Sequence, residues 1–125
     1  MTSDDKIIFE TYQAATRKPN PYTDEAGIIR YEDENGRAHR DDGPSVIFPS
    51  GATAYHKHGW LHRTDGPAVG FANGKGEYYL NGYDYAGNLK LWAQDVLGSQ
   101  GKPSEDEDIE NFLRQIYKKQ LSSSL

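Results

Sequence analysis

A repeat of 23 residues constrains the fold of this 125-residue chain more than any other feature of its sequence. Two copies run from Gly36 to His58 and from Gly59 to Asn81, and Gly82 begins a third. A fixed period of this length indicates one supersecondary unit that is stacked several times. The two copies share the motif His-Arg-x-Asp-Gly-Pro, which comprises His39, Arg40, Asp42, Gly43 and Pro44 in the first copy and His62, Arg63, Asp65, Gly66 and Pro67 in the second.

Turn-forming residues divide each copy into short extended runs. Asp-Gly-Pro predicts one bend, because glycine tolerates positive φ and proline restricts the residue before it. Ser50-Gly51 and Asn73-Gly74 predict a second bend, since Asn-Gly is a strong hairpin signal. A third bend is expected at His58-Gly59 and its equivalent. The pattern predicts a ribbon over residues 24–82, a meander of roughly five to seven short antiparallel strands with two in each repeat.

The segments on either side of the repeat show helical patterns. Apolar side chains share one face of residues 3–16, which predicts an N-terminal helix within residues 1–18. Residues 24–35 look like a shortened first repeat, with Asp24–Ile29 aligned to Asp42–Ile47 and a strand expected at 27–31. The third copy breaks off after Gly82, and a helix is predicted at 85–97.

A second C-terminal helix is predicted from Ser104, which can cap its first turn, with acidic residues at the positive end of the helix dipole. We therefore predict one α+β domain, in which the N-terminal helix and two helices within residues 83–125 cover the ribbon. The aromatic face of the ribbon is expected to pack on the C-terminal helix pair. The acidic run at residues 105–110 is interpreted as a helix start, and a docking patch is the alternative.

The repeat resembles the MORN repeat, a hairpin unit that stacks into an elongated sheet. The resemblance covers residues 28–82, and the motif followed by Tyr-Leu-Asn-Gly looks like a MORN-like variant of small bacteriophage and bacterial proteins. The resemblance implies a scaffold or binding surface. Its phage variant implies a protein that binds and inhibits a host protein, such as part of a defence system, in the host cytoplasm.

Composition excludes several classes of site. The chain has no cysteine, so disulfides and thiolate metal sites are ruled out. Its net charge is −5, and the repeat region, which holds all four histidines, is near neutral. Direct nucleic-acid binding is not expected, because it needs a basic stripe. No apolar run approaches the length of a membrane helix and no signal peptide is visible, so we expect a cytoplasmic protein without membrane contact.

The motif residues are interpreted as structural. Equivalent positions in neighbouring repeats lie two strands apart, about 9–10 Å, so His39 and His62 cannot converge on one metal ion. We expect each imidazole to brace a bend by hydrogen bonding to the neighbouring repeat. The arginine of each motif is expected to hold the aspartate two residues later. No metal ion or other cofactor is predicted.

The candidate binding residues are those that differ between the copies. His56 and His58 are expected on one face of a strand, either as incidental surface or as part of a binding surface. Trp60 corresponds to Arg37 and Tyr83 in the neighbouring copies, so the repeat itself does not require tryptophan there. Tryptophan is enriched at interface hot spots. The predicted binding surface therefore comprises Arg37, His56, His58, Trp60 and Tyr83.

These observations favour a non-enzymatic module that binds a protein partner, such as a host bacterial protein. No nucleophile–base pair, phosphate-binding loop or carboxylate dyad is recognisable. A self-assembling structural protein that forms homodimers through a ribbon edge is the first alternative. A small hydrolase or nuclease that uses His39, His56, His58 or His62 is the second.

Overall fold

Short hairpins and two C-terminal helices make up residues 19–124, the part of the chain that this computed structural model describes, with side chains to residue 121. The helices are α2 (Leu89–Ser99) and α3 (Asp106–Ser124). The predicted N-terminal helix lies outside the described residues. The strands are β1 (Tyr22–Thr23), β2 (Ile29–Arg30), β3 (Val46–Ile47), β4 (Thr53–Ala54), β5 (His56–Lys57), β6 (Trp60–Leu61), β7 (Val69–Gly70), β8 (Gly76–Glu77), β9 (Tyr79–Leu80) and β10 (Tyr83–Asp84).

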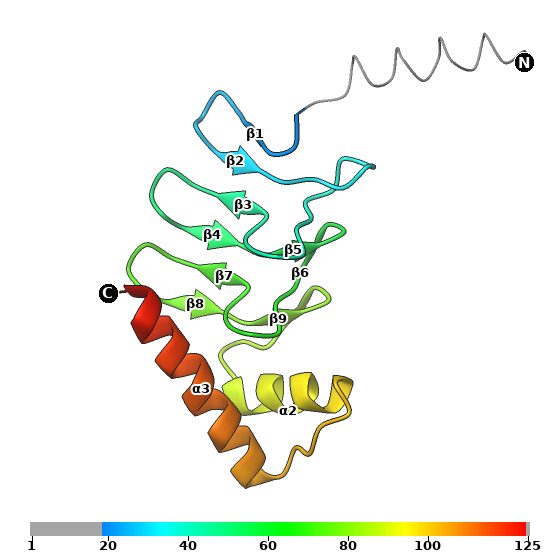
Figure 1. The fold of residues 1–125 in the computed structure, drawn as a ribbon, viewed down its shortest axis with the longest axis vertical. Helices are drawn as coiled ribbons and strands as arrows, with labels where there is room; N and C mark the ends of the chain where they lie inside the picture. Colours follow the sequence, from blue (N-terminus) through cyan, green and yellow to red (C-terminus); the bar gives the residue numbers. More distant parts are fainter. Residues whose placement is uncertain (1–18, 125) are drawn as a thin grey trace, which may run out of the picture.

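The strands form two columns of hairpins that stand side by side (Figure 1). One column is a six-stranded antiparallel sheet in the order β1-β2-β3-β4-β7-β8. The other contains the separate hairpins β5–β6 and β9–β10, preceded by an isolated bridge between Glu32 and Ala38. Three stacked units follow: unit 1 (residues 22–38), unit 2 (46–61) and unit 3 (69–84). The predicted α+β meander with two C-terminal helices is confirmed.

The number of strands corrects the prediction of about two per repeat. Units 2 and 3 each contain four strands, one hairpin for each column. The extended run bends at Tyr55, because its backbone groups find partners outside the β3–β4 hairpin. The Tyr55 N–H donates to Ala68 O at 2.7 Å, and the Tyr55 carbonyl accepts from the His62 N–H at 3.0 Å. These two bonds end the first hairpin and start the second.

Unit 1 is a full unit, and the alignment predicted for residues 24–35 is wrong. The strand expected at 27–31 is β2, but it pairs with β1 before it and with β3 after it. It therefore corresponds to the second strand of each hairpin, β4 and β8. The turn after Asp33 contains one more residue than its counterpart after Lys57, and this shifts the repeat to 24 residues here. The polar Asp24–Ile28 segment is a turn rather than a copy of the motif.

Unit 3 is also complete, because Tyr83 and Asp84 supply its last strand before the third sequence copy breaks off as predicted and α2 follows. Strand β10 pairs with β9, and the Tyr85 N–H donates to Tyr78 O at 3.1 Å, as the His62 N–H does to Tyr55 O. Ala86 and Gly87 then adopt positive φ angles of 51° and 82°. Helix α2 therefore begins four residues later than expected, where the Asn88 side chain accepts from the Leu91 N–H.

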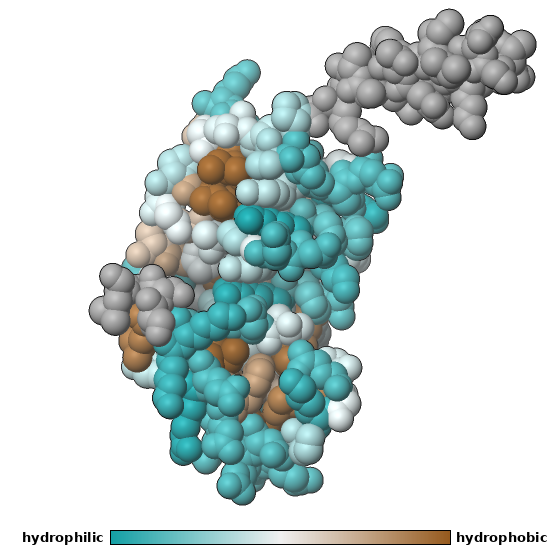
Figure 2. Space-filling model, in the orientation of Figure 1, coloured by the Kyte–Doolittle hydropathy of each residue, from teal (hydrophilic) through white to brown (hydrophobic). Residues whose placement is uncertain are grey.

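The two helices close the end of the ribbon rather than cover one of its faces. Helix α2 lies beneath unit 3, and α3 crosses it and rises along the side of the six-stranded sheet (Figure 1). The ribbon side chains that pack in the helix core are Tyr78, Leu80 and Tyr85, which lie in unit 3 or directly after it. The aromatic face of the ribbon therefore packs on the helices at this end rather than over its whole length. In Figure 2 the hydrophobic surface over this end lies where the two helices meet. The core joins Trp92, Ala93, Val96 and Leu97 of α2 to Tyr85, Ile109 and Ile116.

At the opposite end of the ribbon, the Asn20 side chain bonds to the backbone position that a motif arginine contacts in units 2 and 3. In unit 2 the His56 carbonyl accepts from the Arg40 N–H, and in unit 3 the Tyr79 carbonyl accepts from the Arg63 N–H. Glu32 is the equivalent residue of unit 1, where no motif precedes it. Instead, the Asn20 amide donates to Glu32 O at 2.8 Å and accepts from the Glu32 N–H at 2.9 Å.

Candidate functional site

The two motif segments link the units, and their arginines fix the bends. Arg40 Nε donates to Asp42 Oδ1 at 2.9 Å, and Nη1 donates to Pro44 O at 3.2 Å. The guanidinium lies over the Tyr31 ring of the preceding unit, 4.0 Å from its centroid. Hydrogen bonding from Arg40 lowers the pKa of Asp42. The equivalent contacts of Arg63 are to Asp65 at 2.7 Å, Pro67 O at 3.1 Å and the Tyr55 ring at 4.0 Å.

The glycine of each motif leaves room for the arginine. A Cβ atom at Gly43 would lie 2.8 Å from Arg40 Cζ, and one at Gly66 would lie 2.8 Å from Arg63 Cζ. Neither glycine has a positive φ angle, so the requirement is space rather than backbone conformation. Gly66 is buried, and the guanidinium occupies the position that a side chain would take.

The two motif histidines join neighbouring units. Nδ1 of His39 accepts from the His58 N–H at 3.0 Å, and Nδ1 of His62 accepts from the Asn81 N–H at 3.0 Å. Accepting at Nδ1 requires that the neutral ring carry its proton on Nε2. His58 and Asn81 adopt φ angles of 47° and 48° in the turns that receive these bonds. Burial, and then the charge of nearby Lys57, lower the pKa of His62.

Trp92 of helix α2 takes the place of a third arginine. Tyr78 is the unit 3 equivalent of Tyr31 and Tyr55, but Ala86 stands where an arginine would cover it. Trp92 packs edge-on against Tyr78 with ring centroids 4.7 Å apart, and its Nε1 donates to Arg63 O at 3.3 Å. Trp92 is fully buried. The helix therefore ends the stack by covering the tyrosine that a further unit would have covered.

Arg37, Trp60 and Tyr83 occupy the same position in the three hairpins of the second column. We call these residues the strip. The Trp60 ring lies against Gly82, where any side chain would collide with the ring. Arg37 lies beside Gly59, and its Cβ is 3.6 Å from the position that a Cβ atom would take at Gly59. Trp60 is 63% exposed and Tyr83 61%. Arg37 and Trp60 therefore pack inward on glycines, Tyr83 packs edge-on against Tyr85 with ring centroids 4.8 Å apart, and the strip presents its outer side to solvent.

His58 supports the strip from one side through Asp33. Its Nδ1 lies 2.8 Å from Asp33 Oδ2, and the same carboxylate accepts from Arg37 Nε at 3.0 Å. The His58 ring stacks on His39 at 4.0 Å between centroids. The bond from His58 and the backbone bonds to Asp33 hold the pKa of that carboxyl well below its usual range, against the effect of desolvation.

His56 does not join His58 on one strand face, and that prediction is wrong. Strand β5 ends at Lys57, and His58 turns away in a left-handed conformation. Nδ1 of His56 lies 2.7 Å from the hydroxyl of Ser45, which is fully buried and donates to Ala54 O. Burial lowers the pKa of His56. His56 thus packs between the columns and lies apart from the strip.

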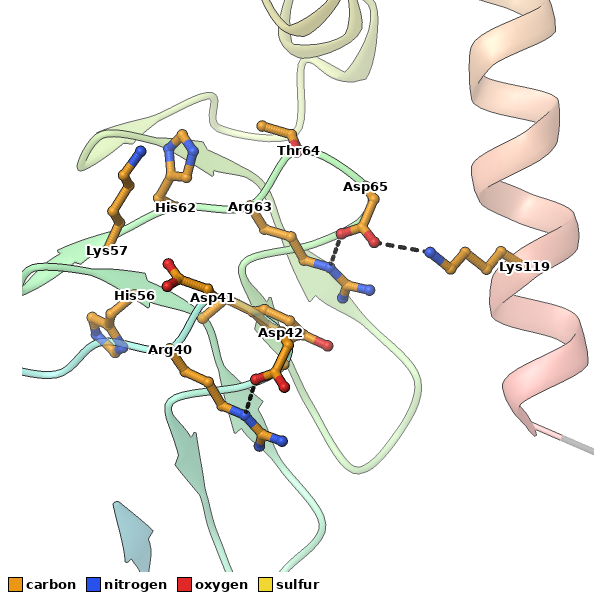
Figure 3. Close-up of a pocket in the computed structure, with 12 residues that line it drawn as sticks. Arg40, Asp41, Asp42, His56, Lys57, His62, Arg63, Thr64, Asp65 and Lys119 are labelled. Atoms are coloured by element: carbon orange, nitrogen blue, oxygen red, sulfur yellow. Dashed lines mark hydrogen bonds and ion pairs between the residues drawn. The ribbon is translucent and has the colours of Figure 1, made fainter. Parts of the chain in front are cut away.

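A polar groove of about 580 Å³ lies between the two linkers (Figure 3). Arg40 and Arg63 extend in the same direction, each joined to the aspartate two residues later. Lys119 reaches across from α3 to Asp65 at 2.8 Å. Burial opposes ionisation of Asp65, but hydrogen bonds from Lys119 and Arg63 outweigh it and lower the pKa. The two arginines of the groove, together with Asp42 and Asp65, are committed to the bends.

Hydrolytic chemistry finds little support in these contacts. Ser45 pairs with His56, but its hydroxyl is buried and bonded on both sides, so a substrate carbonyl cannot reach it. Among the described residues no three histidine, aspartate or glutamate side chains converge as metal ligands. His39 and His62 hold neighbouring turns through their ring nitrogens.

Sequence reasoning did not identify Asp33 or Trp92 as key residues. The signal for Asp33 was the Asp-x-x-Gly turn, in which an aspartate side chain caps backbone N–H groups. The signal for Trp92 was the series of equivalent tyrosines Tyr31, Tyr55 and Tyr78, the last of which has no motif arginine to cover it. Lys119 could not be found, because its contact with Asp65 joins residues 54 positions apart.

Comparison with models of known protein families, with curated protein sequences and with solved structures finds no match to this chain. Within residues 19–124, neither helix has the length and apolar character needed to cross a membrane.

Proposed function

We propose that this protein is a non-enzymatic binding module whose strip contacts a protein partner. The observation that carries the proposal is the exposure of Trp60 and Tyr83 at 63% and 61% on consecutive hairpins. Large aromatic side chains lose apolar contact with water when a partner covers them, and tryptophan and tyrosine are enriched among the residues that dominate binding energy.

The scaffold supports this proposal because it holds the strip rigidly. The glycines beneath Arg37 and Trp60, the stacked histidines and the Arg-Asp bends fix the position of the hairpins before a partner arrives. A preorganised surface loses less conformational entropy on binding. Residues His56 and His58 contribute indirectly, since one packs between the columns and the other positions Asp33 beside Arg37.

The resemblance to the MORN-like phage variant adds to the proposal the kind of partner and the effect on that partner. The repeated hairpins stack into an elongated ribbon, as such repeats do, and the motif residues serve the stacking. In this form the partner is a host bacterial protein that the module inhibits in the host cytoplasm. A match of the captured partner to a host defence component would support it.

The test compares two variants that each remove two exposed aromatic side chains. Trp60→Ala/Tyr83→Ala removes them from the strip, and Phe48→Ala/Phe71→Ala removes them from the hairpin tips of the other column, where they are 38% and 46% exposed. The immobilised proteins are incubated with bacterial lysate, and bound proteins are quantified by mass spectrometry. We expect a stoichiometric partner that the wild type and the Phe variant retain and the strip variant loses. Equal capture by all three proteins would refute the strip as the binding surface.

Self-assembly through a ribbon edge is the second candidate, because β8 (Gly76–Glu77) is an end strand of the six-stranded order and both of its residues are exposed. The edge of an end strand can recruit another chain. Light scattering during size-exclusion chromatography distinguishes the two candidates. A strict monomer at micromolar concentration removes self-assembly, and a stable dimer that captures no partner removes the binding module.

A further inference from the structure

We infer that the ligand of the strip is a proline-rich segment in the polyproline II conformation, running along the stacking direction with an acidic residue at the Arg37 end. This inference rests on the proposed function and specifies the chemistry of the partner. It follows from the spacing of the strip, from the side-chain groups that it exposes and from its charge.

The spacing of the strip matches the period of a polyproline II helix. Each repeat adds two strands to the six-stranded sheet, so successive units are displaced by about 9–10 Å. A polyproline II helix has three residues per turn and rises about 3.1 Å per residue, which brings every third residue to one side at intervals of about 9.3 Å. One ligand residue in three therefore faces Arg37, Trp60 and Tyr83 in turn. Seven ligand residues span the strip.

The exposed chemistry also fits this conformation. The outer faces of Trp60 and Tyr83 are flat and apolar, as are the proline-binding surfaces of domains that recognise such peptides. The Trp60 indole N–H has no hydrogen-bond acceptor among the described residues, so it can donate to a ligand carbonyl. Backbone carbonyls of a polyproline II helix make no internal hydrogen bonds and remain available. A partner β-strand fits less well, because the strip crosses the hairpins instead of following a strand edge.

Charge places the acidic residue of the ligand. Arg37 uses Nε to hold Asp33, and its side chain remains 52% exposed. Lys57 lies directly opposite Trp60 in the β5–β6 ladder, is exposed, and has no ion pair among the described residues. Directly opposite residues project from the same face of a hairpin. Arg37 is therefore the cation at its end of the strip, while Lys57 lies beside His62 at the middle of the strip and Asp84 follows Tyr83 at the other end.

The experiment measures fluorescence anisotropy of labelled ten-residue peptides titrated with the full chain. The probe carries glutamate at its first position and proline at its fourth, seventh and tenth positions. The control peptide has the same composition with the prolines moved to the third, seventh and eighth positions. Because Trp92 is buried and Trp60 is exposed, a change in the tryptophan emission maximum reports contact at the strip independently.

We expect saturable binding of the probe, at least fivefold weaker binding of the control, and a loss of about three- to tenfold for each of Trp60→Ala and Tyr83→Ala. Phe71→Ala should bind as the wild type does. Arg37→Glu should weaken binding of the glutamate probe and favour a probe with lysine in that position.

Two results would overturn the inference. One is the absence of saturable binding by the probe while the strip still captures a lysate protein, which would leave the proposed function standing. The other is Trp60-dependent binding of a single-stranded oligonucleotide or an oligosaccharide in preference to the peptide. If neither peptide nor lysate protein depends on Trp60, the proposed function fails as well.

Discussion

Replacing Gly66 by alanine should destabilise the protein, although alanine normally improves on glycine by reducing the entropy of the unfolded chain. The new Cβ atom would lie 2.8 Å from Arg63 Cζ, which is closer than two such atoms can approach. The Arg63 side chain is only 18% exposed and is held between the Tyr55 ring and Asp65. It must therefore leave its position, and its contacts are lost together.

The magnitude follows from those contacts. Removing a hydrogen bond from a charged group costs about 1.5–3 kcal/mol, and this applies to the bond from Arg63 to Pro67 O. The partly exposed pair with Asp65 adds about 0–1 kcal/mol. The cation–π contact with Tyr55 adds about 0.5–1 kcal/mol. We expect a loss of about 2–4 kcal/mol in the free energy of unfolding, measured by denaturant titration with circular dichroism.

A double-mutant cycle tests the cause. In the Arg63→Ala background the obstruction is gone, so Gly66→Ala should cost less than about 0.5 kcal/mol. Gly98→Ala is the matched control, because a Cβ atom there meets nothing within 4 Å and alanine favours the α2 helix by about 0.5–1 kcal/mol. An equal cost of Gly66→Ala with and without the Arg63 side chain would show that the reasoning from space is wrong.

Three further predictions concern other contacts of the fold. Trp92→Ala should lower the free energy of unfolding by about 3–5 kcal/mol, because it empties the buried contact beneath unit 3; denaturant titration should show a smaller loss for Trp92→Phe. Burial lowers the pKa of His62, so below pH 6.5, the ordinary pKa of histidine, the unfolded chain binds more protons and stability should fall. The difference in melting temperature between pH 7 and pH 5 should be smaller for His62→Asn than for the wild type. An unchanged difference would contradict this assignment. The lowered pKa of Asp33 contributes stability that disappears as this carboxylate is protonated in acid. Asp33→Asn should therefore destabilise the protein at neutral pH and lose less of its remaining stability in acid. An unchanged dependence of the free energy of unfolding on acid pH would refute this role.

The sequence by itself determined the repeated unit. The 23-residue period, the Asp-Gly-Pro bends and the glycine turns are local signals, and they specified antiparallel hairpins of the observed kind. The Arg-Asp pairing of the motif was also readable, because the two residues are only two positions apart. The amphipathic pattern around Ile109 and Ile116 specified the last helix and its buried face in the same way.

The tertiary structure decided where each unit bends and how the stack ends. The break at Tyr55 depends on backbone partners in the next unit, and such partners leave no periodic signal in the strand itself. The pairing of His58 with Asp33 joins residues 25 positions apart, and Trp92 meets Arg63 O across 29. Local propensity cannot encode these contacts, because they form only when stacking brings distant segments together. The strip also depends on stacking, since stacking aligns residues that are 23 positions apart in the chain on one exposed surface.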